Sequence, residues 1–215
     1  MHLPFTSEDF LNVFKTYNEA IFPMQLIFFI VALFIVLMLF RKTIVKDKFI
    51  SYSLSFFWLW MGIVYQIIYF SEINKAAYVF GVLFIVQGII FFTYARVPYK
   101  MSYQFDKSIY NYVGLLFILY ALLIYPVVGY FLGHNYPHSP TFGAPCPTTI
   151  FTFGVLLFVR NKIPVWAMII PLLWSIIGFG AAISLSIYED VGLLIAGLAG
   201  FGLIIKRNKE IESLA

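Results

Sequence analysis

Long apolar segments separated by short charged breaks make up most of this chain. A helix of about 20 apolar residues crosses a bilayer core of about 30 Å, and lipid offers no partner for an unpaired backbone group. By this measure, the apolar segments lie near residues 21–40, 50–70, 76–95, 110–132, 147–159, 164–187 and 190–205. The pattern therefore predicts an all-α membrane protein with seven transmembrane helices.

The first 20 residues follow another pattern, in which apolar side chains recur at helical spacing between polar ones. Thr6 followed by Asp9 has the spacing of a capping box. We therefore expect an amphipathic N-terminal segment over residues 1–20 that lies on the membrane surface. With a seven-helix bundle over 21–205 and a cytoplasmic tail over 206–215, the whole of residues 1–215 forms a single transmembrane domain.

Lysine and arginine are distributed unevenly between the two sides of the predicted bundle. Twelve of the fourteen follow the first, third, fifth and seventh segments, and only Lys15 and Lys75 lie on the other side. The positive-inside rule then places the C-terminus in the cytoplasm and the N-terminus outside. Segments one to three and five to seven share an orientation, as in a 3+1+3 parallel repeat. Chance similarity in a sequence rich in Leu, Phe and Trp is the alternative.

The composition supports the membrane class and excludes others. Hydrophobic residues make up 62% of the chain and charged residues 11%, with a mean hydropathy of +0.91, against about 25% charged residues in soluble domains. The single cysteine excludes an internal disulfide and any Cys-x-x-Cys site. The net charge of +4 is explained by basic residues beside anionic lipid headgroups, so we expect no nucleic-acid partner.

One polar, proline-rich segment stands out between Gly133 and Thr149. It contains the only cysteine, two of the three histidines and four of the ten prolines. The apolar helix that follows has about 12 residues, or about 18 Å, which is too short to span a bilayer alone. Non-helical backbone at membrane depth must be buried in protein or line a wet cavity. We therefore expect this segment to dip inward and form an outward-facing vestibule.

His134, His138 and Cys146 in this segment offer two imidazoles and a thiol, ligands that suit zinc or copper. Their spacing matches no recognised metal motif, so we expect no cofactor, and hydrated loop histidines are the alternative. Cys146 lies at a helix start, where the helix dipole favours a reactive thiolate. The alternative is a rigid helix start with an inert buried thiol.

Other polar residues lie close to the same predicted side or within the apolar segments. Asn18 and Glu19 directly precede the first segment. Gln66 and Gln87 lie within segments, where they either line a path for a neutral solute or form interhelical hydrogen bonds. Acids outnumber basic residues on the outer side and favour cations there, unless they are ordinary cap and loop residues; these acids are Glu8, Asp9, Glu19, Glu72, Glu189 and Asp190. We expect no ionisable side chain near the middle of a segment, which argues against a buried proton relay.

Several motifs resemble those of a family of bacterial integral membrane proteins of unknown function. They are Leu3-Pro4-Phe5-Thr6, Tyr17-Asn18-Glu19-Ala20-Ile21-Phe22-Pro23-x-Gln25, Gly133-His134-x-Tyr136-Pro137 and Pro140-Thr141-Phe142-Gly143-x-Pro145-Cys146-Pro147-Thr148-Thr149-Ile150-Phe151. The resemblance extends over essentially the whole chain. It implies a multi-pass protein of the bacterial cytoplasmic (inner) membrane, and it carries no activity, ligand or cofactor.

Three functional hypotheses follow from these observations, and whether the protein is an enzyme stays open. The first is a transporter or channel for a small solute or ion; its vestibule and path would be lined by Asn18, Glu19, Gln66, Gln87, His134, His138, Cys146 and Thr149. The second is a membrane-embedded enzyme or metal/redox sensor that uses an extracytoplasmic Cys/His site. The third is an accessory subunit of a membrane complex. The expected partners are the lipid bilayer and a small solute or ion, and formation of a homo-oligomer stays open.

Overall fold

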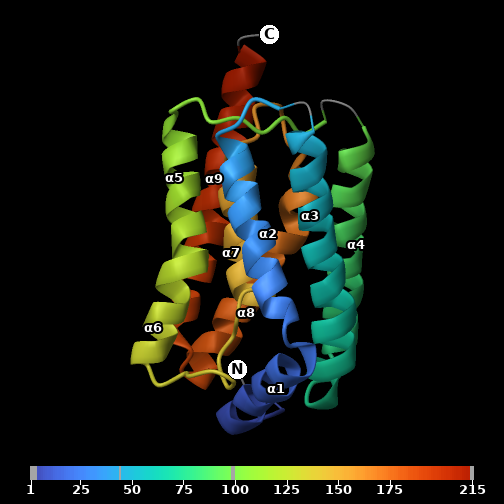
Figure 1. Cartoon of the computed structure of the whole chain (residues 1–215), viewed down its shortest axis with the longest axis vertical. Helices are drawn as coiled ribbons and strands as arrows, with labels where there is room; N and C mark the ends of the chain where they lie inside the picture. The colour runs from blue at the N-terminus through green and yellow to red at the C-terminus, as the bar shows by residue number, and fades with distance from the viewer. Residues whose placement is uncertain (1–3, 44, 98–99, 214–215) are drawn as a thin grey trace.

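The computed structural model describes residues 4–43, 45–97 and 100–213. Residues 1–3 of the predicted N-terminal segment and 214–215 of the predicted tail lie outside the described residues. The regular secondary structure of the described part consists of helices, without a strand. Most helices run side by side along one axis, and α1 lies across one end of the bundle (Figure 1).

The helices follow one another with short connections, and two of them pass into a π-helix along their length. Their bounds are α1 Ser7–Ile21, α2 Met24–Leu39, α3 Lys46–Trp60 with the π-helix η1 Met61–Tyr69 and the 3₁₀ turn η2 Phe70–Glu72, α4 Ala77–Arg96, α5 Ile109–Leu119 with the π-helix η3 Tyr120–Ile124 and α6 Tyr125–Phe131, α7 Pro145–Leu156, η4 Val165–Met168 with α8 Ile169–Leu185, and η5 Tyr188–Asp190 with α9 Val191–Ser213.

Among the described residues, five helical stretches are long and apolar enough to cross a membrane: Lys46–Glu72, Ala77–Arg96, Ile109–Phe131, Val165–Leu185 and Tyr188–Ser213. A sixth is counted if α1 and α2, which meet at a bend of 85°, form one broken span. α7 has only 12 residues. The chain is therefore a multi-pass membrane protein, but the predicted count of seven spans is not confirmed. α9 continues as a helix to Ser213, through most of the predicted tail.

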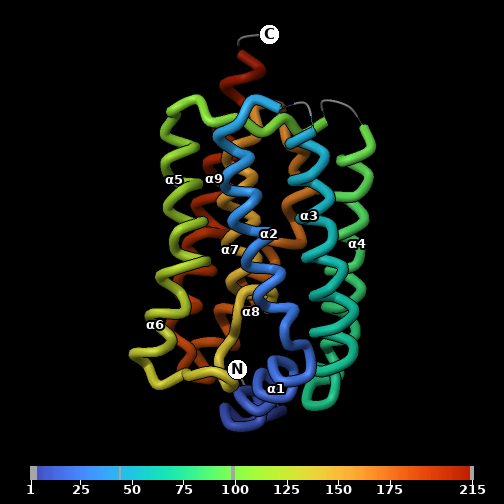
Figure 2. Tube along the Cα trace, viewed as in Figure 1, coloured from blue at the N-terminus to red at the C-terminus, as the bar shows by residue number. Residues whose placement is uncertain are grey.

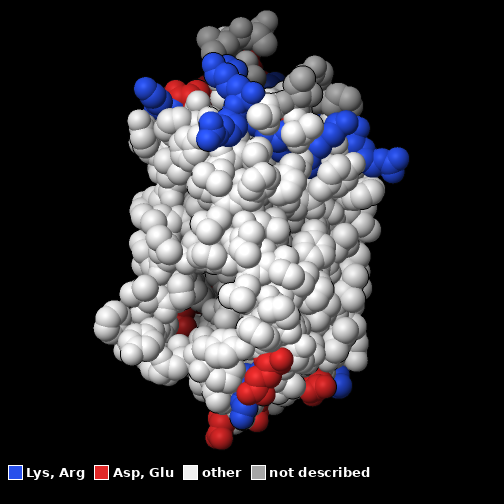
Figure 3. Space-filling model, in the orientation of Figure 1, with Lys and Arg blue, Asp and Glu red and all other residues white. Residues whose placement is uncertain are grey.

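Charged side chains gather at the two ends of the bundle. On the face in Figure 3, lysine and arginine lie mainly at the end where the C-terminus emerges, and most acids lie at the opposite end, beside α1. The wide band between the two ends is uncharged on this face, except for an acid visible in a hollow above the α1 end. We call these ends the basic end and the α1 end. The separation matches the uneven lysine and arginine distribution of the sequence.

α1 begins with the predicted capping box, which is confirmed. The Thr6 backbone N–H donates to Asp9 Oδ2 over 2.9 Å, and the Asp9 N–H donates to Thr6 Oγ1 over 3.1 Å. The Thr6 N–H and the Thr6 hydroxyl, which donates to the same carboxylate oxygen over 2.7 Å, lower the pKa of Asp9. On the other face of the helix, Val13, Phe14 and Tyr17 are buried against the bundle. The cap and this apolar face together hold α1 across the end of the helices.

α7 is the enclosed central helix of the fold. Every residue from Pro145 to Leu156 is buried, and Figure 2 shows the helix running between its neighbours. The chain reaches α7 at the α1 end through a buried non-helical segment and leaves it towards the basic end, where Val159 pairs with Tyr103. The structure therefore encloses a helix that is too short to span a bilayer alone.

Glycine allows the neighbouring helix to approach α7 closely. A Cβ atom on Gly114 of α5 would lie 2.7 Å from the Gly154 carbonyl oxygen, and one on Gly154 would lie 2.9 Å from the Gly114 carbonyl oxygen. Both distances are too short for a side chain, so only glycine permits this crossing. Gly62 and Gly81 form a similar pair between η1 and α4.

Side chains from other helices bind polar groups of α7. The indole Nε1 of Trp58, a fully buried residue of α3, donates to Thr152 Oγ1 over 3.1 Å. At the other end, Arg207 Nη1 donates to the Leu156 and Leu157 carbonyl oxygens over 3.3 and 3.2 Å. Arg207 is only 7% exposed, so it binds the end of α7 rather than standing free at the surface as its place in the basic cluster suggests.

The 3+1+3 repeat stays a prediction. α2 and α7 would be corresponding helices, yet α7 is wholly buried, whereas α2 exposes several large apolar side chains, among them Leu26, Ile30 and Leu37. Helices in matching positions thus have different surroundings.

Candidate functional site

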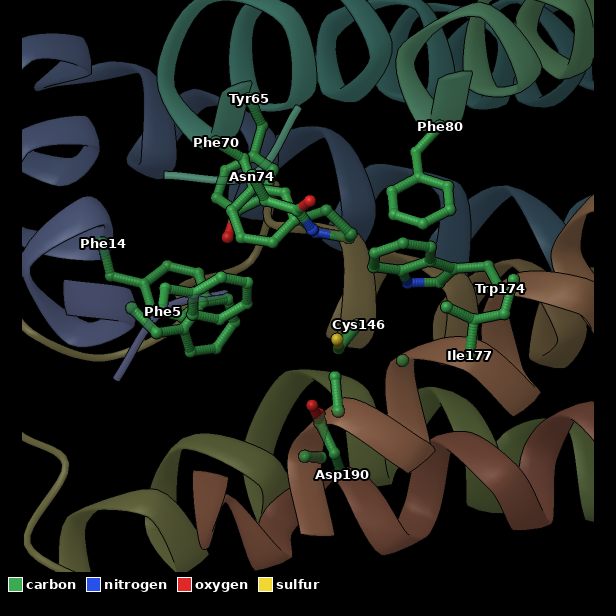
Figure 4. A pocket seen from close by; sticks show the side chains of 15 residues that line it. Phe5, Phe14, Tyr65, Phe70, Asn74, Phe80, Cys146, Trp174, Ile177 and Asp190 are labelled. Carbon is green, nitrogen blue, oxygen red and sulfur yellow. The ribbon is translucent and has the colours of Figure 1, made fainter. Parts of the chain in front are cut away.

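A cavity of about 160 Å³ lies at the α1 end, where the start of α7 meets α1, η1, α4, α8 and η5. Nearly half of the residues that line it are aromatic. The rings come from Phe5, Phe10, Phe14, Tyr65, Phe70, Phe80 and Trp174. Figure 4 shows Cys146 in the middle of this group, with Trp174 on one side and Asp190 on another. The cavity is therefore an apolar chamber with a thiol and a carboxyl group in its wall.

Asp190 is the acidic residue of this chamber, and among the described residues no other acidic or basic side chain lines it. It is 3% exposed. The Tyr125 hydroxyl donates to Asp190 Oδ1 over 2.6 Å, and the Cys146 thiol lies within hydrogen-bonding reach of the same carboxyl group. Neutral donors from two helices thus hold Asp190 in place.

Glu189 lies next to Asp190 in the chain but binds a different partner. Its side chain is fully buried, and its Oε1 lies 2.8 Å from His134 Nδ1. The Tyr120 hydroxyl donates to the Glu189 backbone carbonyl over 2.7 Å. Among the described residues, Glu189 Oε2 has no hydrogen-bond partner. Because the loop histidine binds this acid, the proline-rich loop is tied to the start of α9.

Both π-helical segments contribute side chains to this end of the molecule. Tyr65 of η1 lines the cavity. Tyr120 lies in η3, and Tyr125 follows directly after it. A π segment changes the direction of the side chains around it and is frequent at functional sites. Here the irregular turns place three tyrosines around the two acids and the cavity.

The turn before α7 brings Cys146 to the cavity. Gly143 has a φ of +103°, a conformation that favours glycine. A Cβ atom at this position would also clash with the Phe28 ring. The Gly143 N–H donates to Thr148 Oγ1 over 3.1 Å, which closes the turn. The segment Gly143-Ala144-Pro145 therefore enters the bundle and starts α7 beside Asp190.

Asn18 is a structural anchor of the proline-rich loop. Its Nδ2 donates to the Pro137 and Ser139 carbonyl oxygens over 2.7 and 2.8 Å, and its Oδ1 accepts from the Thr141 hydroxyl over 2.8 Å. Glu19, beside it in the chain, is exposed. Neither residue lines the cavity. The sequence placed both near the loop, and the structure brings only Asn18 into contact with it.

The three predicted metal ligands are not brought together. His134 binds Glu189, and Cys146 lies beside Asp190. His138 lies instead on a separate, more open groove with Glu8 and other α1 residues. The described residues contain no group of three or more His, Cys, Asp and Glu side chains placed to hold a metal ion. The geometry therefore does not assemble the zinc or copper set predicted from the sequence.

Gln66, Gln87 and Thr149 are fully buried and lie outside the cavity wall. Gln87 Nε2 donates to the Ala167 carbonyl oxygen over 3.1 Å, an interhelical hydrogen bond. Within the described part of the chain, the Gln66 amide and the Thr149 hydroxyl have no hydrogen-bond partner. Of the eight residues predicted to line the vestibule, Cys146 alone lines this chamber. The other side chains around the chamber are mainly apolar, whereas a water-filled vestibule was expected.

The structure adds residues that the sequence did not single out. Glu189 and Asp190 were expected on the outer side as part of an acidic mouth, but both are buried. In the sequence, they form an acidic pair directly before a long apolar segment. Acids are also common at the start of a solvent-exposed helix, so this position did not indicate burial. Tyr120 and Tyr125, five positions apart within an apolar segment, gave no distinct signal. Only tertiary packing brings these four residues together.

The fold and this chamber define a class: a multi-pass α-helical membrane protein with a small aromatic cavity at one end of its bundle. Over residues 7–213 the chain matches the family described as "Family of unknown function (DUF6064)", and it belongs to that family. No match was found among curated proteins or among solved structures. Because the family description assigns no activity, the function has to be inferred from the site.

Proposed function

We propose that this protein is a transporter for a small, largely apolar solute in the bacterial cytoplasmic membrane, and that the aromatic cavity is its solute site. The observation that carries the proposal is the cavity at the start of α7, walled by side chains from α1, η1, α4, α8 and η5. Sites of this kind, apolar with a few convergent polar groups, are typical of small-molecule binding.

The charge pattern sets the orientation that we propose. The basic end faces the cytoplasm by the positive-inside rule, so the cavity opens on the outer half of the membrane. α2 and α7 then count as crossings together with the five long stretches, which gives seven helices with the N-terminus outside and the C-terminus inside. In this arrangement the proline-rich loop covers the outer side, as expected from the sequence.

Two structural features support transport rather than static binding. α7 begins inside the bundle after a non-helical segment, as do the discontinuous helices at transporter binding sites. Gly62 and Gly81, and likewise Gly114 and Gly154, bring helix backbones into close contact. We propose that the helices shift against one another at these contacts, as alternating access requires.

The alternative of an outer-face enzyme or redox sensor has less support. A catalytic or redox thiol is activated by a neighbouring base or positive charge. His134, whose imidazole could supply this, binds Glu189, and an acid is the neighbour of Cys146. The hypothesis of an accessory subunit does not explain why the protein has this cavity.

Cys146 allows a direct test because it is the only cysteine of the chain. A small, membrane-impermeant methanethiosulfonate reagent is added to right-side-out and to inside-out membrane vesicles, and modification is measured by mass spectrometry. A transporter with alternating access exposes Cys146 to both sides, so both preparations react. The Cys146→Ser variant gives the background. Modification from the outer side alone would contradict transport and favour a fixed receptor or sensor.

A further inference from the structure

Within the part of the chain that the structure describes, Asp190 has no basic partner. Its neighbours within hydrogen-bonding reach, the Tyr125 hydroxyl and the Cys146 thiol, are neutral donors. Among the described residues, ion pairs join His134 to Glu189 and Lys162 to Glu212, and Asp190 forms none. A buried, ionised carboxylate is costly unless a cation lies beside it. Within the described residues, the chamber therefore contains a buried carboxyl group without a basic partner, and a cation bound beside it would stabilise its ionised form.

The walls of the chamber indicate which kind of cation fits. Aromatic rings attract positive charge over their faces, and tryptophan does so most strongly. Phe70 and Phe5, with ring centroids 5.6 Å apart, and Trp174 line the cavity around Cys146 (Figure 4). A hydrated inorganic ion needs several oxygen ligands. Because the wall offers mainly carbon, an organic cation with apolar substituents fits better than a metal ion.

The edge of the chamber supports a lipid-soluble ligand. Several lining residues are partly exposed, among them Asn74 and Phe80, which are half-buried, and Ile177, which is 37% exposed. Phe80 belongs to α4 and Ile177 to α8, both candidate membrane spans. No lysine or arginine lines this edge within the described residues. An amphiphilic cation can therefore approach this part of the chamber from the outer leaflet.

We infer that the cavity binds a small organic cation, an amine or quaternary ammonium ion with apolar groups, whose charge rests beside Asp190 and whose substituents contact the aromatic rings. The inference rests on the proposed function, in which this cavity is the solute site. It narrows the solute from any apolar molecule to one that carries a positive charge. Tyr125 acts here as a positioning residue, because its hydroxyl fixes the orientation of the carboxylate.

The test uses two ligands of the same shape that differ only in charge. Benzyltrimethylammonium is the cation, and neopentylbenzene, with carbon in place of nitrogen, is its neutral counterpart. Each is added to full-length protein in liposomes, and the rate of Cys146 modification by N-ethylmaleimide is measured. We expect the cation to slow modification about 10-fold at a concentration at which the neutral compound has little effect, as charge and aromatic contacts predict.

Two variants assign this effect to Asp190. Asp190→Asn should remove the difference between the two ligands. Glu72→Gln, which neutralises an exposed acid at the same end of the bundle, should keep it. If Asp190→Asn does not fold, the comparison of the two ligands on the unmodified protein still decides the matter.

Other outcomes separate the two proposals. Equal protection by both ligands would overturn the inferred cation while leaving an apolar solute site. Lack of protection by either ligand, combined with failure of the reagent to reach Cys146 from any side, would overturn both the cation and the transport proposal. Retention of the cation preference in Asp190→Asn would overturn the role of this carboxylate.

Discussion

His134 and Glu189 form a buried pair. Replacing one partner should show how much the pair contributes to the stability of the fold. The Glu189 side chain is fully buried, that of His134 is 13% exposed, and their nearest atoms lie 2.8 Å apart. His134→Ala leaves the carboxylate buried without this partner. Removing one member of a buried pair costs about 3–5 kcal/mol. Because the histidine retains some contact with solvent, we expect a value of about 3 kcal/mol, at the low end of that range.

The measurement follows tryptophan fluorescence as the bundle unfolds in detergent. Trp58 and Trp174 are buried, so their emission changes as heating exposes them to solvent. In a protein of this size about 1 kcal/mol corresponds to about 2–4 °C in the midpoint. His134→Ala should therefore lower the midpoint by about 6–12 °C. His138→Ala, in the same loop but on an open groove, should change it by no more than about 2 °C.

A double-mutant cycle distinguishes loss of the pair from general loop damage. Glu189→Gln removes the buried charge, so the double variant with His134→Ala should be more stable than His134→Ala alone. The reasoning is refuted if His134→Ala and His138→Ala shift the midpoint equally. It is also refuted if adding Glu189→Gln to His134→Ala does not raise the midpoint, because His134→Ala would then have left no unpaired charge.

Three further predictions concern other parts of the fold. Gly154→Ala places a Cβ atom against backbone and should be less stable than Gly202→Ala, which meets open space, by about 1–3 kcal/mol in the same thermal assay; equal midpoints would contradict the close crossing. Arg207→Met should lower the midpoint while the exposed Lys206→Met does not, since only the first removes donors to the α7 carbonyls; matching midpoints would contradict that cap. The lowered pKa of Asp9 means that its capping contribution is present above the unfolded pKa of about 4 and disappears as the pH falls through the folded value. Hydrogen exchange in the first turn of α1 should therefore be faster, relative to an unstructured peptide, at pH 3 than at pH 7, unless the cap is not formed in solution.

Most of the helices could be predicted from the sequence, because a membrane span is recognised from the apolar composition of its own residues. The apolar stretches near 50–70 and 76–95 became Lys46–Glu72 and Ala77–Arg96 with small shifts at the ends. The capping box of α1 was equally local. The short apolar stretch near 147–159 indicated an unusual helix, but its complete burial depends on the surrounding helices.

The candidate site was only partly predictable, and the reason is physical. Cys146 drew attention as the single cysteine among prolines, and it lines the cavity. The acids Glu189 and Asp190 look in sequence like any polar pair at the start of a helix, since burial is decided by α1, α6 and the proline-rich loop folding over them. His134 was singled out for a metal, and its actual partner is 55 positions away. Long-range pairings of this kind leave no periodic signal.

The enclosure of α7 has a consequence for how the protein is made. A helix without a lipid-facing side is not selected for solubility in lipid, and α7 contains threonine at positions 148, 149 and 152. Its 12 residues make a weak insertion signal for the translocation machinery. α8 and α9, which are synthesised later, supply part of its walls. Stable integration of α7 therefore has to wait for the C-terminal third of the chain. A reporter protein fused just after α7 replaces α8 and α9, so it would report the side of the membrane that the chain reaches without them.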